Sequence, residues 1–216
     1  MKSIVTPFDL AFNHLPLVAI LRGITPAEVV AVGGTLYDEG FRLIEVPLNS
    51  PNALESIKLL KRSLPADAVI GAGTVLTPEA VFQVRDAGGT LIVMPHADVN
   101  VIKTARSLGL FCLPGITTLT EAFAAIHAGA DALKIFPAEL ITPAILKAMR
   151  VVLPPAMPLL PVGGITPERM SAYREAGATG FGLGSVLFAP GMPAEKVTLR
   201  AREFVEAWKA QAAQST

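Results

Sequence analysis

Short apolar runs recur along the whole chain, and they constrain the fold more than any other feature. The segments between them have amphipathic spacing, and five of these open with a cap residue and a proline suited to a first helical turn, at Thr25-Pro26, Ser50-Pro51, Thr77-Pro78, Thr142-Pro143 and Thr166-Pro167. The runs cover residues 17–21, 43–48, 69–73, 91–94, 110–113, 132–136, 159–162 and 180–184. Eight strand–helix units without a break in composition predict one α/β domain over residues 1–216, a (β/α)8 TIM barrel. A flavodoxin-like open sheet is the alternative, but it normally ends after about five such units.

Composition narrows the classes of partner. Apolar residues make up 51% of the chain, yet charges interrupt every run well before the roughly 18 residues of a membrane span. Strands buried on both faces explain such an apolar excess. The formal net charge is zero without blocks of like charge, which argues against a nucleic-acid partner. Residues 15–21 run directly into Arg22 without a cleavage pattern, so we expect no signal peptide and a cytoplasmic protein.

Cysteine and histidine usage predicts neither a disulfide nor a metal site. Cys112 is the single cysteine, and its strand-like setting is typical of a buried small hydrophobe. The three histidines, His14, His96 and His127, are scattered and lack metal-ligand spacing. The Gly-x-Gly pairs beginning at residues 71 and 182 lack the third glycine of a dinucleotide fingerprint. We therefore expect no metal and no cofactor.

Lys134 is the most unusual residue of the apolar runs, because it sits inside residues 132–136. A buried lysine without a partner tends to lose its proton, and a neutral amine in a dry pocket attacks carbonyl carbon. The alternative is a lysine that reaches water or pairs with a carboxylate for structure alone. Phe136 would either shield an iminium from water or simply pack in the core.

Glu45 is equally out of place in the run 43–48. Strand alternation would turn it toward the interior, where desolvation raises a carboxyl pKa into the range useful for general acid–base catalysis. A structural pairing with Lys134 is the competing interpretation. Because active sites of such barrels lie at the carboxyl ends of the strands, a lysine and a glutamate on separate strands favour a catalytic pair.

Glycine-rich turns follow the last two runs, at Gly163-Gly164 and Gly184-Ser185. In barrels of this kind these loops often bind phosphate through backbone amides, although glycines can also serve tight turns alone. Thr74 and Arg22, at the ends of two other strands, offer a hydroxyl and a fixed positive charge to an anionic ligand. Arg22 could equally pair with a neighbouring carboxylate.

These motifs together resemble the class I aldolases that cleave 2-keto-3-deoxy-6-phospho sugar acids. The matching segments, which follow one another in the family's order and spacing along the predicted barrel, are Ile44-Glu-Val46, Gly71-Ala-Gly-Thr-Val75, Leu133-Lys-Ile-Phe-Pro137, Val162-Gly-Gly-Ile165 and Gly182-Leu-Gly-Ser185. In the phosphogluconate branch of this family, a segment similar to Glu-Val-Thr-Leu-Arg-Thr stands at the end of the second strand, and its arginine binds the substrate carboxylate. This chain has Glu45-Val-Pro-Leu-Asn-Ser-Pro51 and Ile20-Leu-Arg-Gly-Ile-Thr-Pro26 instead, which is similar to the phosphogalactonate branch. Arg22 and Thr74 are then the expected carboxylate anchors.

The resemblance implies a lyase of carbohydrate metabolism, in galactonate degradation, that cleaves 2-dehydro-3-deoxy-6-phospho-D-galactonate to pyruvate and D-glyceraldehyde 3-phosphate. Lys134 would form the Schiff base and Glu45 would move protons, while Gly163, Gly164, Gly184 and Ser185 would hold the phosphate. It implies a homotrimer that needs no cofactor. Three alternatives stay open: the same reaction on the gluconate epimer, a metal-dependent isomerase or epimerase, and a non-catalytic phosphosugar-binding barrel.

Overall fold

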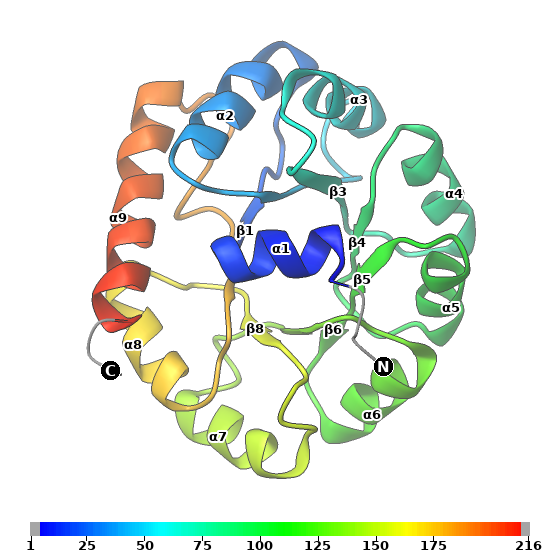
Figure 1. Ribbon diagram of the computed structural model, residues 1–216, viewed down its shortest axis with the longest axis vertical. Helices are drawn as coiled ribbons and strands as arrows, with labels where there is room; N and C mark the ends of the chain where they lie inside the picture. The colour runs from blue at the N-terminus through cyan, green and yellow to red at the C-terminus, as the bar shows by residue number, and fades with distance from the viewer. Residues whose placement is uncertain (1–4, 213–216) are drawn as a thin grey trace.

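Strands and helices alternate along residues 5–212, which are the residues that the computed structural model describes (Figure 1). The strands are β1 (Leu17–Ile20), β2 (Leu43–Pro47), β3 (Val69–Gly73), β4 (Leu91–Val93), β5 (Phe111–Leu113), β6 (Gly115–Ile116), β7 (Leu133–Ile135), β8 (Leu159–Pro161) and β9 (Phe181–Leu183). The helices are α1 (Pro7–His14), α2 (Pro26–Asp38), α3 (Ala53–Ser63), α4 (Pro78–Asp86), α5 (Val99–Ser107), α6 (Leu119–Ala128), α7 (Pro143–Val152), α8 (Pro167–Glu175) and α9 (Ala194–Ala212). Every predicted apolar run contains a strand.

Four of the five predicted helix starts are confirmed, since α2, α4, α7 and α8 each begin at the proline that follows a threonine N-cap. The fifth is wrong. Helix α3 begins at Ala53 rather than at Pro51, and its N-cap is Asn52 in the left-handed region at φ 47°. The hydroxyl of Ser50 is engaged elsewhere, because it accepts a hydrogen bond from the backbone N–H of Gly23 at 2.9 Å.

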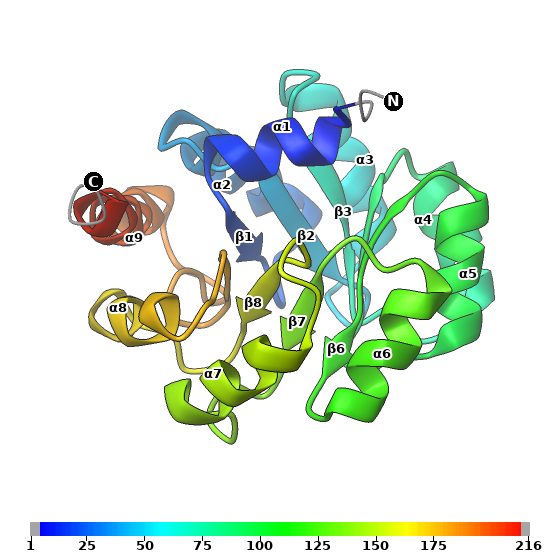
Figure 2. The same ribbon diagram turned by 60° about the horizontal axis from the view of Figure 1, so that its bottom comes forward.

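Helix α1 occupies a stretch for which the sequence predicted only a short lead before the first strand. Its N-cap Thr6 and Asp9 form a capping box, and Pro7 stands at the first helical position. This is the same threonine–proline signal that marks the later helices. Figures 1 and 2 show α1 lying across one end of the strands, while α2 to α9 surround them.

The strands form two parallel sheets. Six strands pair in the order β5-β4-β3-β2-β1-β9, and three pair in the order β6-β7-β8. Pro114 separates β5 from β6, because a proline has no N–H to contribute to a ladder. Its carbonyl still accepts a hydrogen bond from the backbone N–H of Lys134 at 2.9 Å. The architecture is an α/β fold in which the six-stranded sheet is a parallel half-barrel.

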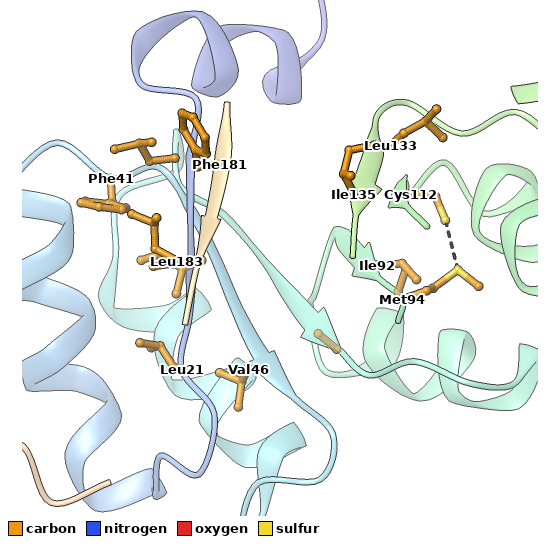
Figure 3. Packing of buried hydrophobic residues seen from close by; sticks show 14 of the residues in the cluster. Leu21, Phe41, Val46, Ile92, Met94, Cys112, Leu133, Ile135, Phe181 and Leu183 are labelled. Atoms are coloured by element: carbon orange, nitrogen blue, oxygen red, sulfur yellow. Dashed lines mark hydrogen bonds between the residues drawn. The ribbon is translucent and has the colours of Figure 1, made fainter. Parts of the chain in front are cut away.

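Alternation along the strands sorts their side chains into two buried clusters. The larger one packs the strands against the surrounding helices (Figure 3). Cys112 belongs to it and is fully buried, with its Sγ donating to Sδ of Met94 at 3.7 Å, which confirms the predicted role of a small core residue.

The smaller cluster, called the inner cluster below, lies on the opposite face of the strands. Phe8 and Ala11 of α1 join it, so this helix packs directly on the interior of the strand assembly. Its members are Phe8, Ala11, Val18, Leu43, Val69, Leu91, Val93, Leu113, Ala132 and Leu160.

Among residues 5–212, the helices are all too short or too polar to cross a lipid bilayer.

Candidate active site

Lys134 and Glu45 both point to the inner face of the strands. Lys134 follows the inner-cluster residue Ala132 by two positions, and Glu45 follows the inner-cluster residue Leu43 by two. Because side chains alternate with a period of two, each charge continues an inward-facing row toward the carboxyl end of its strand. The predicted orientation of Glu45 is thereby confirmed.

Burial changes the acid–base properties of both groups. Glu45 is 1% exposed and Lys134 is 6% exposed. Desolvation raises the pKa of Glu45 to about 7, against the opposing attraction of Lys134 and Arg22. Desolvation likewise lowers the pKa of Lys134, with Glu45 acting in the opposite sense and Arg22 adding to the lowering. A carboxyl that titrates near neutrality and an amine that loses its proton easily are the two groups that iminium chemistry requires.

The two groups interact electrostatically without direct pairing. The ion pairs formed among residues 5–212 all join other side chains, so Lys134 and Glu45 lie farther apart than a salt bridge. The interpretation of Lys134 as the structural salt-bridge partner of Glu45 is therefore wrong. Oε2 of Glu45 is buried without a hydrogen-bond partner in the described chain. Such an atom is costly to maintain, and a substrate hydroxyl or a water molecule would satisfy it.

Gly73 makes room for this carboxylate. A Cβ added at Gly73 would collide with the carboxylate of Glu45. Gly73 pairs with Pro47 in the β2–β3 ladder, so its backbone is fixed and cannot retreat. The glycine of the Gly71-Ala-Gly-Thr segment thus serves close approach by a neighbouring side chain.

Arg22 is held by two polar side chains from the ends of β2 and β3. Its Nη1 donates to Oδ1 of Asn49 at 2.8 Å, and its Nη2 lies 3.5 Å from Oγ1 of Thr74. Thr74 has a φ of 55°, which is rare for a β-branched residue and occurs chiefly where the surrounding structure imposes it. No carboxylate of the described chain pairs with Arg22, so the alternative of a paired arginine is wrong.

A cavity of about 120 Å³ brings seven of the nine predicted site residues together. Lys134 reaches it from β7, and Nζ lies 4.7 Å from the ring centroid of Phe136, which forms part of the wall. The predicted residues that line it are Arg22, Lys134, Phe136, Gly163, Gly164, Gly184 and Ser185. Thr74 and Glu45 do not line this cavity; Thr74 adjoins it through Arg22, and Glu45 acts electrostatically on Lys134.

The two glycine turns differ in the space they offer. Gly163 and Gly164 have φ values of 111° and 57°, and the exposed carboxylate of Glu139 lies against both. A Cβ added at Gly184 would meet nothing within 4 Å, and Ser185 beside it is exposed. The first turn carries charges of both signs, because the guanidinium of Arg169 also lies against Gly164 and donates to its carbonyl. The second turn has open space, and Arg200 donates to the carbonyl of Ser185 at 3.3 Å.

Sequence reasoning missed the apolar part of the cavity wall. It consists of Ile20, Val162, Ile165, Gly182 and Val186. Two of them were accessible in principle, because Ile20 and Gly182 continue the inward-facing rows of β1 and β9 by the same alternation that places Lys134. His96 is exposed and lies outside the cavity.

Residues 9–199 match the sequence profile of the aldolases described as "KDPG and KHG aldolase". This match covers most of the chain. The chain belongs to the KDPG and KHG aldolase family.

Members of this aldolase family from two bacteria are similar to the chain over nearly its whole length. The "2-dehydro-3-deoxy-6-phosphogalactonate aldolase" of Escherichia coli (strain K12) is 45% identical over 197 residues, which cover 91% of this chain and 96% of that protein. The "Probable 2-dehydro-3-deoxy-6-phosphogalactonate aldolase" of Rhizobium meliloti (strain 1021) is 44% identical, with coverages of 90% and 92%. A solved structure described as "Native KDPGal structure" has a TM-score of 0.91 at 44% identity and covers 92% of this chain and 97% of that one.

Proposed function

We propose that the protein is a class I aldolase that cleaves 2-dehydro-3-deoxy-6-phosphogalactonate to pyruvate and D-glyceraldehyde 3-phosphate. The observation that carries this proposal is the buried, electrostatically coupled pair of Lys134 and Glu45 beside a cavity lined by the glycine turns. The two phosphogalactonate relatives at 44–45% identity support the choice of substrate.

Lys134 is the nucleophile. Its depressed pKa provides the neutral amine, which attacks the C2 ketone to give a carbinolamine, and loss of water then gives the iminium. The ring centroid of Phe136 lies 4.7 Å from Nζ of Lys134, and this ring limits the access of bulk water to the intermediate. The aromatic face also stabilises the positive charge that the nitrogen acquires.

Glu45 moves the protons. As a carboxylate it takes the proton of the C4 hydroxyl, directly or through one water, and the C3–C4 bond breaks with its electron pair passing to the iminium. Glyceraldehyde 3-phosphate leaves, and the resulting enamine is protonated at C3 by the carboxylic acid just formed. Hydrolysis of the new iminium releases pyruvate and restores Lys134. A pKa of about 7 suits Glu45 to both directions of this transfer.

The two anionic ends of the substrate have separate sites. Arg22 and Thr74 bind the carboxylate, and Gly163, Gly164, Gly184 and Ser185 bind the phosphate. Within the second set, the open space at Gly184 favours a phosphate position closer to Ser185 than to Gly163. The carboxylate of Glu139, which is exposed, would turn away from the phosphate into solvent.

We propose further that residues 1–216 form one domain in which the two sheets close into a (β/α)8 TIM barrel. Two contacts support closure. An isolated parallel bridge joins Val162 after β8 to Gly182 in β9, and Pro114 alone stands between β5 and β6. Counting β5 and β6 as one interrupted strand gives the eight strands of that fold.

The expected assembly is a cytoplasmic homotrimer, acting on a phosphorylated sugar acid in galactonate degradation. Its support is the family resemblance, together with exposed large apolar side chains such as Leu76, Phe82 and Leu140, which a subunit interface would cover. Light scattering of the purified protein measures the number of subunits.

The deciding experiment is intact-mass analysis after incubation with pyruvate and borohydride. We expect one reduced pyruvate per chain on the wild type, none on Lys134→Ala, and a normal adduct on Lys103→Ala, which removes an exposed lysine of α5. A wild type that stays unmodified while well folded would exclude Schiff-base catalysis and favour a phosphosugar-binding protein. Cleavage rates on the galactonate and gluconate epimers then decide the substrate.

A further inference from the structure

Asn49 contacts Arg22, the arginine that lines the cavity, although Asn49 itself does not line it. It follows β2 by two residues, and its Oδ1 accepts a hydrogen bond from Nη1 of Arg22 at 2.8 Å. We propose that Asn49 is a positioning residue, which holds the Arg22 guanidinium where it binds the substrate carboxylate. The inference rests on the proposed aldolase function and deepens it.

The neighbouring residue strengthens this contact. Ser50 is 7% exposed, and its hydroxyl accepts a hydrogen bond from the backbone N–H of Gly23 at 2.9 Å. Two consecutive residues after β2 therefore hold two consecutive residues after β1. One contact fixes the backbone from which Arg22 extends, and the other fixes the end of its side chain.

The contacts to Asn49 and Thr74 also determine the direction in which the Arg22 guanidinium points. Asn49 and Thr74 follow β2 and β3, so both contacts draw the guanidinium toward these strands. The glycine turns that we assign to the phosphate follow β8 and β9 instead. An exposed arginine loses side-chain entropy when it is ordered, and the two contacts offset this cost before the substrate arrives.

The position of Arg22 identifies the anion that it binds. Its positive charge acts on both Lys134 and Glu45, lowering the pKa of each, so the guanidinium lies near the reacting centre. In a 2-keto acid the carboxylate is bonded to the carbon that the amine attacks, whereas the phosphate is at the far end of the molecule. Arg22 lines the cavity together with Lys134, and its contacts to Asn49 and Thr74 draw it away from the glycine turns, so we assign it the carboxylate.

An asparagine suits this task because its amide oxygen orients a guanidinium without neutralising it. An aspartate at position 49 would form an ion pair and compete with the substrate for Arg22. No carboxylate of residues 5–212 does so at present. The positive charge consequently remains available to a ligand.

Two ketones separate this role from the chemistry of Lys134. Pyruvate carries both the carbonyl and the carboxylate, and acetone carries the carbonyl alone. The rate of borohydride trapping is measured against the concentration of each ketone for the wild type and four variants. These are Asn49→Ala, Asn49→Asp, Asn49→Gln and Asn100→Asp, the last adding the same charge at an exposed asparagine of α5.

We expect Asn49→Ala to raise the half-saturating pyruvate concentration about five- to tenfold, and Asn49→Asp to raise it by more than about tenfold. Asn49→Gln retains an amide oxygen and recovers part of the loss. The rate of trapping by acetone stays unchanged in Asn49→Ala and Asn49→Gln, because acetone lacks the carboxylate that Arg22 binds. In Asn49→Asp the new charge also offsets the effect of Arg22 on the pKa of Lys134, so acetone trapping slows there, but by less than pyruvate trapping does. Asn100→Asp leaves both ketones unaffected.

Two results would overturn the inference while leaving the aldolase proposal intact. One is an unchanged response of Asn49→Ala and Asn49→Asp to pyruvate. The other is an equal loss with acetone, which would mean that Asn49 supports Lys134 or the fold rather than Arg22. A wild type that neither ketone traps would instead overturn the proposed function, and this inference with it.

Discussion

Replacing Glu45 by glutamine should stabilise the protein more at pH 8 than at pH 5. Burial raises the pKa of this carboxyl from 4.5 to about 7. A group whose pKa is raised in the folded state favours folding fully below the unfolded pKa, and this contribution is lost as the pH rises through the folded pKa. The window of loss therefore runs from about pH 4.5 to about pH 7.

The size of the effect follows from the shift. Each pKa unit corresponds to about 1.4 kcal/mol, so the raised pKa of Glu45 destabilises the folded state by about 3 kcal/mol at pH 8 and by about 1 kcal/mol at pH 5. Glutamine does not ionise, and any fixed cost of burying its amide is the same at both pH values. The gain in unfolding free energy should therefore be about 2 kcal/mol larger at pH 8.

Urea unfolding at one fixed protein concentration, followed by the fluorescence of Trp208, the single tryptophan, measures this difference. Glu55→Gln changes an exposed carboxylate on α3, and its effect should stay within about 0.5 kcal/mol at both pH values. The Lys134→Met background removes the attraction between the two groups, so the pH-dependent gain there should be at least as large. An equal effect of Glu45→Gln at pH 5 and pH 8 would refute the assignment of a desolvated carboxyl.

Two further changes test the shape of the site. Gly73→Ala should lower the unfolding free energy by about 1–3 kcal/mol and remove most of the cleavage activity, since the added methyl group displaces the Glu45 carboxylate. The control is Gly34→Ala in α2, where an added Cβ meets nothing within 4 Å. It should raise the unfolding free energy by about 1 kcal/mol and leave activity unchanged. Similar urea curves for the two variants would contradict this. Thr74→Gly should raise KM without loss of stability, because it relieves a φ of 55° and removes the hydroxyl beside Arg22; lower stability with an unchanged KM would show that the hydroxyl serves folding.

The strands and most helix starts were predictable because they depend on local signals. A strand buried on both faces is a short apolar run wherever it occurs, and a threonine before a proline marks a helix start locally. The side chains of Thr77 and Thr142 accept hydrogen bonds from their own helices. The inward direction of Lys134 follows in the same way from alternation with Ala132. Helix α1 carried the same signal at Thr6-Pro7, so its absence from the prediction reflects an overlooked pattern and not a hidden one.

The remaining features depend on contacts between distant residues. Ser50-Pro51 looks like a helix start, but the hydroxyl of Ser50 is taken by Gly23, 27 residues earlier in the chain. The hydrogen bond from Arg22 to Asn49 spans the same separation. The periodicity of apolar residues predicts helices and strands, but it does not predict which distant residue a polar side chain will bind. The close approach of the Glu45 carboxylate to Gly73 could not be predicted from the sequence either, since a glycine in a strand has several possible structural reasons.

Helix α1 gives the interior of the strand assembly a closed end, because Phe8 and Ala11 cover the inner cluster. Water can therefore approach Lys134 from the cavity side but not through that end. The low polarity beneath the amine, which favours its neutral form, thus depends partly on residues near the start of the chain. Shortening the protein before residue 17 would leave every proposed catalytic group in place and still weaken the nucleophile, since an amine in contact with water keeps its proton.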